Sequence, residues 1–450
     1  MPLSGAFLGR VTEFLGPRYV LSGVDRGPYL VGGRTPEGVV FPGSVEEVAH
    51  VLALATEARV SVAPWGGGTK MALGTPPREL GIVLGLSRLN RLVEHEPGDL
   101  TATAQAGMPL GTFQAALAEK GQWLSLDPGY ADRATLGGVI ATNAAGPRRH
   151  LYGTARDLVI GITVVTGEGR IVTGGGRVVK NVAGYDLPKL FIGSLGTLGV
   201  IVELTVKLRP LPEDDRALWA NFPSLEAAAD AVRALMTADL IPHSLELLDP
   251  HGSDGLSRAL GRSMATGASL LVGFDGLAET VAWQLEEAER LCLKGGMTDR
   301  GGLAVADQLR AWDFVRHFPR DLFPEAAVAV KVGILPTQII QFMEQAAGAA
   351  GRRQLRAAFS AHASLGIVAG ALAALSPSEV RDAVACLREW REVAGGLGGH
   401  LVVESAPLAV KEEVAVWDPP GPAFRIMERL KAQLDPAGIL NPGVLLDPVR

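Results

Sequence analysis

The chain has 450 residues, of which 47% are hydrophobic and 20% are charged, a balance that predicts two or three folded domains rather than a disordered protein. Its formal net charge of −6 shows no excess of basic residues, so nucleic acid and anionic lipid are not expected as partners. The two cysteines, Cys292 and Cys386, do not form a CxxC pair, and we expect buried thiols in a reducing compartment. An iron–sulfur cluster or zinc held by this chain alone is therefore excluded.

The N-terminal segment 1–20 lacks an uninterrupted apolar core, which argues against a signal peptide. The longest apolar run, 365–375, is shorter than the ~20 residues that a membrane-spanning helix needs. We therefore expect a cytoplasmic protein, with membrane association only through a partner.

The first 210 residues have the pattern of a strand-rich α+β domain. Ser44 and Glu47 have the spacing of a capping box before a helix, and a second helix is expected to open at Pro109 and close at Gly121. Strands are expected at 60–63, 81–86, 100–106, 158–165, 170–173 and 199–208, with 166–169 as the turn of a hairpin. This order lacks the regular alternation of a Rossmann sheet.

After Pro212 the pattern changes to one of strands alternating with helices. Strands are expected at 217–222, 244–248, 268–274, 327–333, 354–360 and 364–370, and helices at 224–236, 278–293, from Ser376 to about 393, and 424–434. Pro377 would occupy the first helical position behind a capping box formed by Ser376 and Glu379. The order predicts a separate α+β domain with a ferredoxin-like repeat, whereas 295–324 shows no pattern that we can assign.

Three glycine-rich zones lie within the first domain. The first is Gly66, Gly67, Gly68 and Thr69, directly after a strand, where a glycine nest can bind an anion such as phosphate, although a flexible surface turn is the alternative. It is neither a GxGxxG nor a Walker loop. The second zone, 127–153, is made almost entirely of small residues, and the third is 181–199. Such walls suit a large planar ligand, while a close-packed domain corner is the alternative for the second zone.

These zones together resemble the FAD-binding domain of the vanillyl-alcohol oxidase and p-cresol methylhydroxylase family, most closely the FAD-binding subunits of bacterial glycolate oxidases. The residues that carry the resemblance are 41–48, 64–70, 127–128, 134–138, 141–149, 152–153, 179–186, 196–201 and 435–443. The segments PRR-xx-YG (147–153) and VVKNVAGYD are the most specific of them.

The resemblance implies a bilobed FAD domain (1–212), an inserted α+β, ferredoxin-like cap (213–404) and a tail (405–450) that returns to the FAD domain. It also implies non-covalent FAD, because Thr69 and Lys70 stand where some relatives carry the His or Cys that attaches the cofactor. The implied cofactor-binding residues are Trp65, Gly66, Gly67, Gly68, Thr69, Asp127, Pro128, Thr135, Gly137, Gly138, Ala141, Thr142, Asn143, Gly153, Ile201 and Asn441.

The cap departs from the family in the residues that carry hydroxyacid oxidation. Related dehydrogenases have two histidines in an H-x-x-D-G-N-L-H stretch; here His362 remains, but Ala369 replaces the second. They also have a Glu-His pair of metal ligand and base, and here Glu404 is followed by Ser405. A serine cannot take an alcohol proton at neutral pH, and one His with one Glu is a poor divalent site. We therefore expect no metal and name no catalytic residue; an ordinary hydrogen-bonded histidine is the alternative for His362.

Three functions follow from these observations. The first is an FAD-carrying subunit of a glycolate or 2-hydroxyacid oxidase complex, relaying electrons between a sister FAD-linked catalytic subunit and an iron–sulfur subunit. The second is a stand-alone FAD-linked dehydrogenase of a different alcohol or hydroxyacid, whose base is not identified and for which Tyr130, Tyr185 and His400 are candidates. The third is a scaffold that has lost its flavin, against which the intact glycine zones argue. Trp283 and Trp312 could face the flavin, but packing is the expected role of each.

Overall fold

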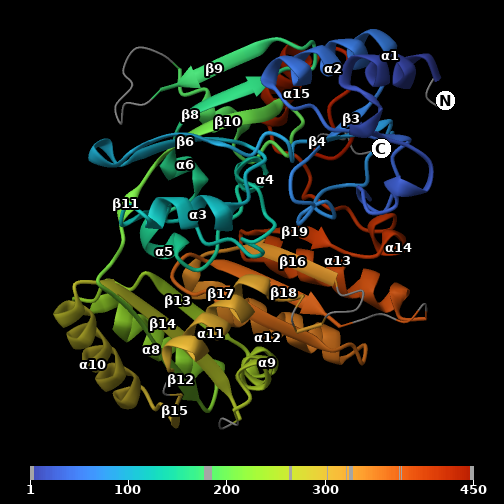
Figure 1. The fold of residues 1–450 in the computed structure, drawn as a ribbon. Coiled ribbons are helices and arrows are strands. Elements are labelled where there is room, and N and C mark those ends of the chain that lie inside the picture. The colour runs from blue at the N-terminus through green and yellow to red at the C-terminus, as the bar shows by residue number, and fades with distance from the viewer. Residues whose placement is uncertain are drawn as a thin grey trace. The chain divides into compact units, whose positions relative to one another are not determined.

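A computed structural model describes residues 5–176, 185–262, 266–301, 303–320, 322–323, 328–373, 376 and 378–445 (Figure 1). Of the VVKNVAGYD segment (178–186), residues 178–184 lie outside these residues. The chain forms two compact units. Unit 1 takes its residues from 1–145, 153–211 and 419–450, and unit 2 from 146–152 and 212–418. Both cysteines are buried and free, and among the residues described no helix is long and apolar enough to cross a membrane.

The first sheet of unit 1 leads to the glycine loop. Its strands are β1 (Val20–Leu21), β2 (Gly38–Val40), β3 (Val62–Trp65) and β4 (Ile82–Gly85), in the order β1-β2-β4-β3 with β2, β4 and β3 parallel. Helices α1 (Gly5–Leu15) and α2 (Val45–Ala58) pack in the same core. Ser44 caps α2 as predicted, but the carboxylate of Glu47 accepts from the N–H of Gly43 and not of Ser44.

The second sheet of unit 1 is antiparallel, in the order β5-β6-β10-β8-β9. Its strands are β5 (Leu92–Glu96), β6 (Thr101–Gln105), β8 (Val159–Val165), β9 (Ile171–Gly175) and β10 (Val200–Lys207). The predicted hairpin is confirmed, because β8 pairs with β9 across 166–169. The remaining elements are α3 (Leu110–Ala118), β7 (Gln122–Trp123), α4 (Leu136–Thr142), α6 (Ala155–Leu158), α7 (Pro188–Phe191), β11 (Arg209–Pro210) and α15 (Phe424–Leu434).

Unit 2 is built on one eight-stranded sheet in the order β15-β12-β14-β13-β17-β18-β16-β19 (Figure 1). The strands are β12 (Asp214–Phe222), β13 (Ser244–Leu248), β14 (Ala268–Gly276), β15 (Asp299–Gly301), β16 (Val328–Gly333), β17 (Ala357–His362), β18 (Ile367–Leu372) and β19 (His400–Ser405). Each half has the strand order of a ferredoxin-like βαββαβ unit, and the halves join through β13 and β17. The predicted ferredoxin-like repeat is therefore confirmed.

The two faces of this sheet differ in what covers them, because neighbouring side chains on a strand point to opposite faces. One face packs with α8 (Leu225–Thr237), α10 (Ala278–Lys294), α12 (Ile339–Gly351) and α13 (Val380–Gly396) in a large apolar core. The other face packs with α9 (Pro250–Leu260) and α11 (Val305–His317), and it also carries polar residues. The short helices α5 (Arg149–Tyr152) and α14 (Leu408–Lys411) complete the unit.

Several predicted boundaries in unit 2 are wrong. The strand expected at 217–222 begins at Asp214. The strand expected at 354–360 begins at Ala357, because Gln354 adopts a left-handed φ of 58°. The strand expected at 364–370 begins at Ile367, because 363–366 form the turn of the β17–β18 hairpin. Helix α13 begins at Val380, four residues after Ser376, although the carboxylate of Glu379 does accept from the N–H of Ser376. The region left unassigned, 295–324, contains β15 and α11.

Candidate functional site

The glycine loop of unit 1 follows β3 and lies against the second glycine-rich zone. A Cβ built on Gly66 would overlap the hydroxyl of Thr135, and one on Gly67 would overlap the carbonyl oxygen of Arg133. Gly68 has a φ of +71°, which disfavours any other residue, and its Cβ would overlap the Trp65 ring. The loop backbone therefore lies so close to Trp65, Arg133 and Thr135 that only glycine fits. Residues 64–69 nevertheless stay partly accessible to solvent.

The second zone forms α4 and its caps. Thr135 caps the helix by accepting from the N–H of Gly138 at 3.4 Å, and the N–H of Gly137 donates to the carbonyl of Ala106 at 2.7 Å. Asn143 ends the helix in a left-handed conformation with a φ of 47°. Its Oδ1 is buried and accepts no hydrogen bond from the residues described. Ala141 and Thr142 lie half-buried on the same helix.

The third zone and the C-terminal tail converge on α4. The N–H of Leu195 donates to the carbonyl of Ala141 at 2.8 Å. Asn441 donates from Nδ2 to the carbonyl of Leu195 at 2.8 Å, and its own N–H donates to the carbonyl of Val62 on β3 at 3.0 Å. The tail thus holds the third zone beside the strand that leads into the glycine loop. The Oδ1 of Asn441 is a second buried amide oxygen that accepts no hydrogen bond in the structure described.

The remaining predicted cofactor residues lie in unit 1, but outside these contacts. Asp127 and Pro128 lie between β7 and α4. Gly153, with a φ of +77°, precedes α6, and Ile201 is buried on β10, where it pairs with Val164 on β8.

FAD suits the residues that converge here. A buried polar group normally has a hydrogen-bond partner, and the orphaned oxygens of Asn143 and Asn441 call for N–H or O–H donors, which a flavin ring and its ribityl chain possess. The close loop of Gly66 to Gly68 supplies backbone N–H groups for an anion such as a pyrophosphate. A bound flavin would supply hydride and single-electron chemistry.

Unit 2 carries a polar cluster on the sheet face that α9 and α11 share. Arg148 donates to Asp275 on β14 at 2.6 Å and also forms an ion pair with Asp215 on β12. Tyr152 donates its hydroxyl to the other oxygen of Asp275 at 2.6 Å. The side chain of Asp275 is 3% exposed and that of Arg148 is 12% exposed. Segment 146–152 is thereby anchored to two neighbouring strands.

Two histidines border this cluster in neutral form. Burial lowers the pKa of His243, so a neutral ring donates from Nε2 to Asp215 at 3.2 Å and accepts at Nδ1 from the hydroxyl of Ser244 at 2.7 Å. Burial alone would raise the pKa of Asp215, but the hydrogen bond from His243 and the charge of Arg148 lower it overall. Burial, followed by the nearby rings of His243 and His362, lowers the pKa of His150.

His362 ends β17 on the same face and is hydrogen-bonded, as the alternative interpretation expected. Its Nδ1 lies 2.5 Å from Oε1 of Glu246, a buried residue of β13. Ala369 of β18 pairs with Ser360, which places it diagonally beside His362 on one face. A histidine at position 369 would therefore be near His362, and alanine leaves that place without a ligand.

Glu404 and Ser405 end β19 on the far side of β16. Ser405 pairs with Ala329, and Glu404 lies in the irregularity between Ser405 and Val403. Lys331 of β16 lies directly across from Ala369. The cross-strand neighbour of Ala369 is therefore a lysine side chain and not a metal ligand. In the part of the chain that is described, no group of three or more His, Cys, Asp or Glu side chains could hold a metal ion.

The other residues considered from sequence take varied positions. Tyr185 is 91% exposed, and His400 is exposed at the start of β19. Tyr130 adopts a left-handed φ of 60° in unit 1. Trp283 is half exposed on α10, whereas Trp312 is buried and its ring centroid lies 5.7 Å from that of His243.

Sequence reasoning missed the carboxylates that form the cluster: Asp215, Glu246 and Asp275. The sequence did contain a signal for such a cluster, because an acidic residue inside an apolar strand is uncommon unless it is paired. Arg148 was noted within the PRR motif without a partner, and the partners lie 67 and 127 residues further along the chain.

The chain matches known flavoproteins along most of its length. Residues 36–175 match the FAD binding domain family, and residues 211–445 match the C-terminal domain of FAD linked oxidases. It is 32% identical to the glycolate oxidase subunit GlcD of Bacillus subtilis, over 91% of this chain and 88% of that protein. It is 31% identical to a D-lactate dehydrogenase of Archaeoglobus fulgidus, over 93% of this chain and 94% of that protein.

The fold is that of the p-cresol methylhydroxylase type. The structure of p-cresol methylhydroxylase with substrate bound is similar at a TM-score of 0.79 and 17% identity, covering 98% of this chain and 96% of that one. The unit 1 sheets, the glycine zones and both family matches thus all indicate that the cofactor is FAD. The chain therefore belongs to the FAD-linked oxidase family, and it is an FAD-dependent oxidoreductase.

Proposed function

We propose that this chain is the FAD-carrying subunit of a 2-hydroxyacid oxidase complex and that its flavin relays electrons. A sister flavoprotein oxidises glycolate or a similar 2-hydroxyacid, and an iron–sulfur subunit receives the electrons. The similarity to a glycolate oxidase subunit supports the substrate class. FAD is held without a covalent bond, because Thr69 and Lys70 offer neither a His nor a Cys at the glycine loop.

The observation that carries the proposal is the position of Ala369 beside His362. The two lie diagonally on one sheet face, so the backbone that would present a pair of histidines is intact while the second imidazole is missing. Ser405 follows Glu404 where the resemblance places the base. A chain with serine at position 405 and no metal site among its described residues can accept and pass electrons, but those positions cannot readily remove the proton of an alcohol.

In unit 1, the residues of this chain would bind and orient the cofactor. Gly66 to Thr69 would bind the pyrophosphate through backbone N–H groups, while the side-chain oxygens of Asn143 and Asn441 would accept hydrogen bonds from the flavin or its ribityl chain. Thr135, Gly138 and Ala141 would form the wall beside it. The hydrogen bonds that Asn441 of the tail donates would keep that wall in place.

A second candidate is a stand-alone dehydrogenase, and the Glu246–His362 pair favours it. A buried carboxylate that accepts from one ring nitrogen fixes the tautomer of an imidazole and leaves the other nitrogen as a proton acceptor. His362 would then be the base in place of Tyr130, Tyr185 or His400.

Dye reduction by the purified, FAD-loaded single chain separates the two candidates. The relay proposal expects no reduction with glycolate or D-lactate, and reduction once the catalytic flavoprotein is added. Rapid substrate-dependent reduction by the single chain that is lost in His362→Gln would support the dehydrogenase instead. A colourless protein that takes up no added FAD would contradict both.

A further inference from the structure

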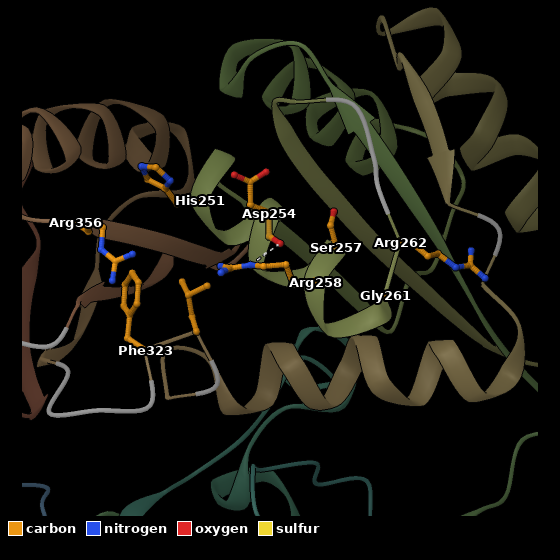
Figure 2. Close-up of a pocket in the computed structure, with 9 residues that line it drawn as sticks. His251, Asp254, Ser257, Arg258, Gly261, Arg262, Phe323 and Arg356 are labelled. Atoms are coloured by element: carbon orange, nitrogen blue, oxygen red, sulfur yellow. Dashed lines mark hydrogen bonds between the residues drawn. The ribbon is translucent and has the colours of Figure 1, made fainter.

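A surface pocket of unit 2 is lined by residues that form no part of the polar cluster described above. It has a volume of about 870 Å³ and is lined by His251, Asp254, Ser257, Arg258, Gly261, Arg262, Leu322, Phe323 and Arg356 (Figure 2). Six of these residues belong to α9 or its C-terminal turn, while Arg356 immediately precedes β17. Nothing in the proposed electron relay makes use of this pocket.

Two of its three arginines have no ion-pair partner among the residues that the structure describes. Arg262 pairs with Asp307 at 2.5 Å. Arg258 makes a hydrogen bond only from Nε to the backbone carbonyl of Asp254, at 3.3 Å, and Arg356 lies over the ring of Phe323 with its Cζ 5.5 Å from the ring centroid. Figure 2 shows the guanidinium groups of Arg258 and Arg356 reaching toward each other from opposite sides.

The position of α9 explains only part of this arrangement. Cations near a helix C-terminus interact favourably with its free carbonyls, which accounts for Arg258 and Arg262 as ordinary capping charges. Arg356 comes from another element and donates no hydrogen bond to that helix end among the residues described. Asp254 also lines the pocket, but its carboxylate forms no ion pair with Arg258 or Arg356 among the residues described. Two like charges that converge without a paired counterion repel one another, so an anion between them would relieve the repulsion.

The two elements that carry the arginines are closely packed. A Cβ on Gly255 would overlap Leu322 and lie 2.9 Å from Phe314, so α9 packs closely on the floor of the pocket. The carbonyl of Arg356 accepts from the N–H of Ala373 at 2.9 Å, which fixes the start of β17. Leu322 is buried and Phe323 half-buried, and together they give the pocket an apolar side next to its two free guanidinium groups.

We propose that this pocket binds a small organic oxyanion, a carboxylate or a phosphate monoester that carries an apolar or aromatic body. Arg258 and Arg356 bind the oxyanion from two sides, since a planar guanidinium matches either group with two parallel N–H donors. Phe323 and Leu322 contact the body. The two guanidinium groups converge on one position, which suits a single charged group rather than an extended acidic segment of a protein.

Calorimetric titration of the FAD-loaded full chain tests the site with two probes, phenyl phosphate and benzoate. Phenol lacks the charge and inorganic phosphate lacks the ring, so each should bind more weakly than its parent probe. The double variant R258Q/R356Q should bind the preferred probe about tenfold more weakly or worse, because it loses two charge-assisted contacts. Arg381→Gln, an exposed arginine on α13, is the matched control and should leave binding unchanged.

The two probes also separate the two anion classes, since the tighter one identifies the natural group. Both substituted side chains are exposed, and an unchanged circular dichroism spectrum and thermal unfolding transition would show that the variant is folded; if the double variant fails this check, Arg356→Gln alone is titrated. Failure of both probes to bind at up to ~10 mM would overturn the proposal. Equal binding by the wild-type chain and the arginine variant would overturn it as well.

Discussion

Nδ1 of His362 lies 2.5 Å from Oε1 of Glu246, which joins two strands, β17 and β13, from the two ferredoxin-like halves of unit 2. The Glu246 side chain is 1% exposed, so this is a buried carboxylate whose partner ring is itself only 18% exposed. The pair has the geometry of a catalytic dyad, yet it also links the two halves of the sheet where β13 pairs with β17. The relay proposal assigns it the second role.

Substitution of this pair distinguishes structure from catalysis. We expect Glu246→Gln to keep a hydrogen-bond acceptor for His362 and to cost about 1 kcal/mol of unfolding free energy, while His362→Ala leaves a buried carboxylate without its ring partner and costs about 2–3 kcal/mol. Chemical denaturation measures both. In the assembled complex neither variant should change substrate-driven reduction by more than about twofold at a temperature where it is folded. A loss of about a hundredfold or more would instead identify the dyad as catalytic.

The ion cluster around Arg148 should contribute to the stability of unit 2. Arg148→Gln leaves Asp275 and Asp215 as neighbouring carboxylates without their cation, and we expect a loss of roughly 2–4 kcal/mol, reduced from the value for a fully buried pair because Asp215 is one-third exposed. Adding Asp275→Asn to this variant removes one uncompensated charge and should recover part of the loss. Urea denaturation of the two single variants and the double variant gives the coupling energy. Purely additive effects would contradict the cluster.

The glycine loop should tolerate no side chain at position 67. In Gly67→Ala the new methyl group would overlap the carbonyl oxygen of Arg133, so the loop must move away from the backbone of 133–134. We expect FAD affinity to fall by about a hundredfold or more, measured by fluorescence as free FAD is released. Gly98→Ala is the control in the same unit, because its Cβ would meet no atom within 4 Å. Equal FAD affinity in the two variants would show that the loop does not hold the cofactor.

Asp249, the N-cap of α9, should make the stability of unit 2 depend on pH. Burial raises its pKa from 3.8 to about 6, although it accepts from the N–H of Gly252. The folded state therefore binds a proton that the unfolded state has lost between pH 4 and pH 6, and the contribution of this group to stability falls as the pH rises through that window.

The Asp249→Asn variant removes this titration and keeps a good cap. We compare the unfolding free energy of this variant with that of wild type at each pH. The difference, variant minus wild type, should increase between pH 4 and pH 7.5 by at most about 3 kcal/mol, at 1.36 kcal/mol per pKa unit. Thermal denaturation across this range measures the change. A difference that stays constant with pH would show that Asp249 is already ionised at pH 4.

Many elements of unit 1 were predicted because their signals are local, although α1, α4 and β5 were not identified. Hairpin residues 166–169 lie between two alternating strands, and Pro109 and Gly121 bracket α3, so each element could be identified from neighbours in the chain. The glycine zones were found because small residues in runs are rare. Their convergence through the Asn441 hydrogen bond to Leu195 spans 246 residues, and no local pattern indicates which zones meet.

Unit 2 shows why other elements were missed. Helix α9 has an Asp-Pro start and the C-terminal Gly261, but Gly252, Ser253 and Gly255 inside it resemble loop residues; they are required because α9 packs closely on β17 and Leu322. Helix α11 buries Gln308, whose amide bonds the backbone of Asp215 and Ala217, so its inner face is not purely apolar. In both helices tertiary contacts override the periodic pattern.

The most direct test of the relay proposal is the visible spectrum of the purified, FAD-loaded single chain, recorded without air before and after glycolate is added. The account predicts a flavin spectrum that stays oxidised, because Ala369 and Ser405 leave the chain without a second imidazole and without a base at position 405. Bleaching of the flavin by glycolate would contradict it and would show that this chain oxidises the substrate itself, with His362 and Glu246 as the first residues to substitute.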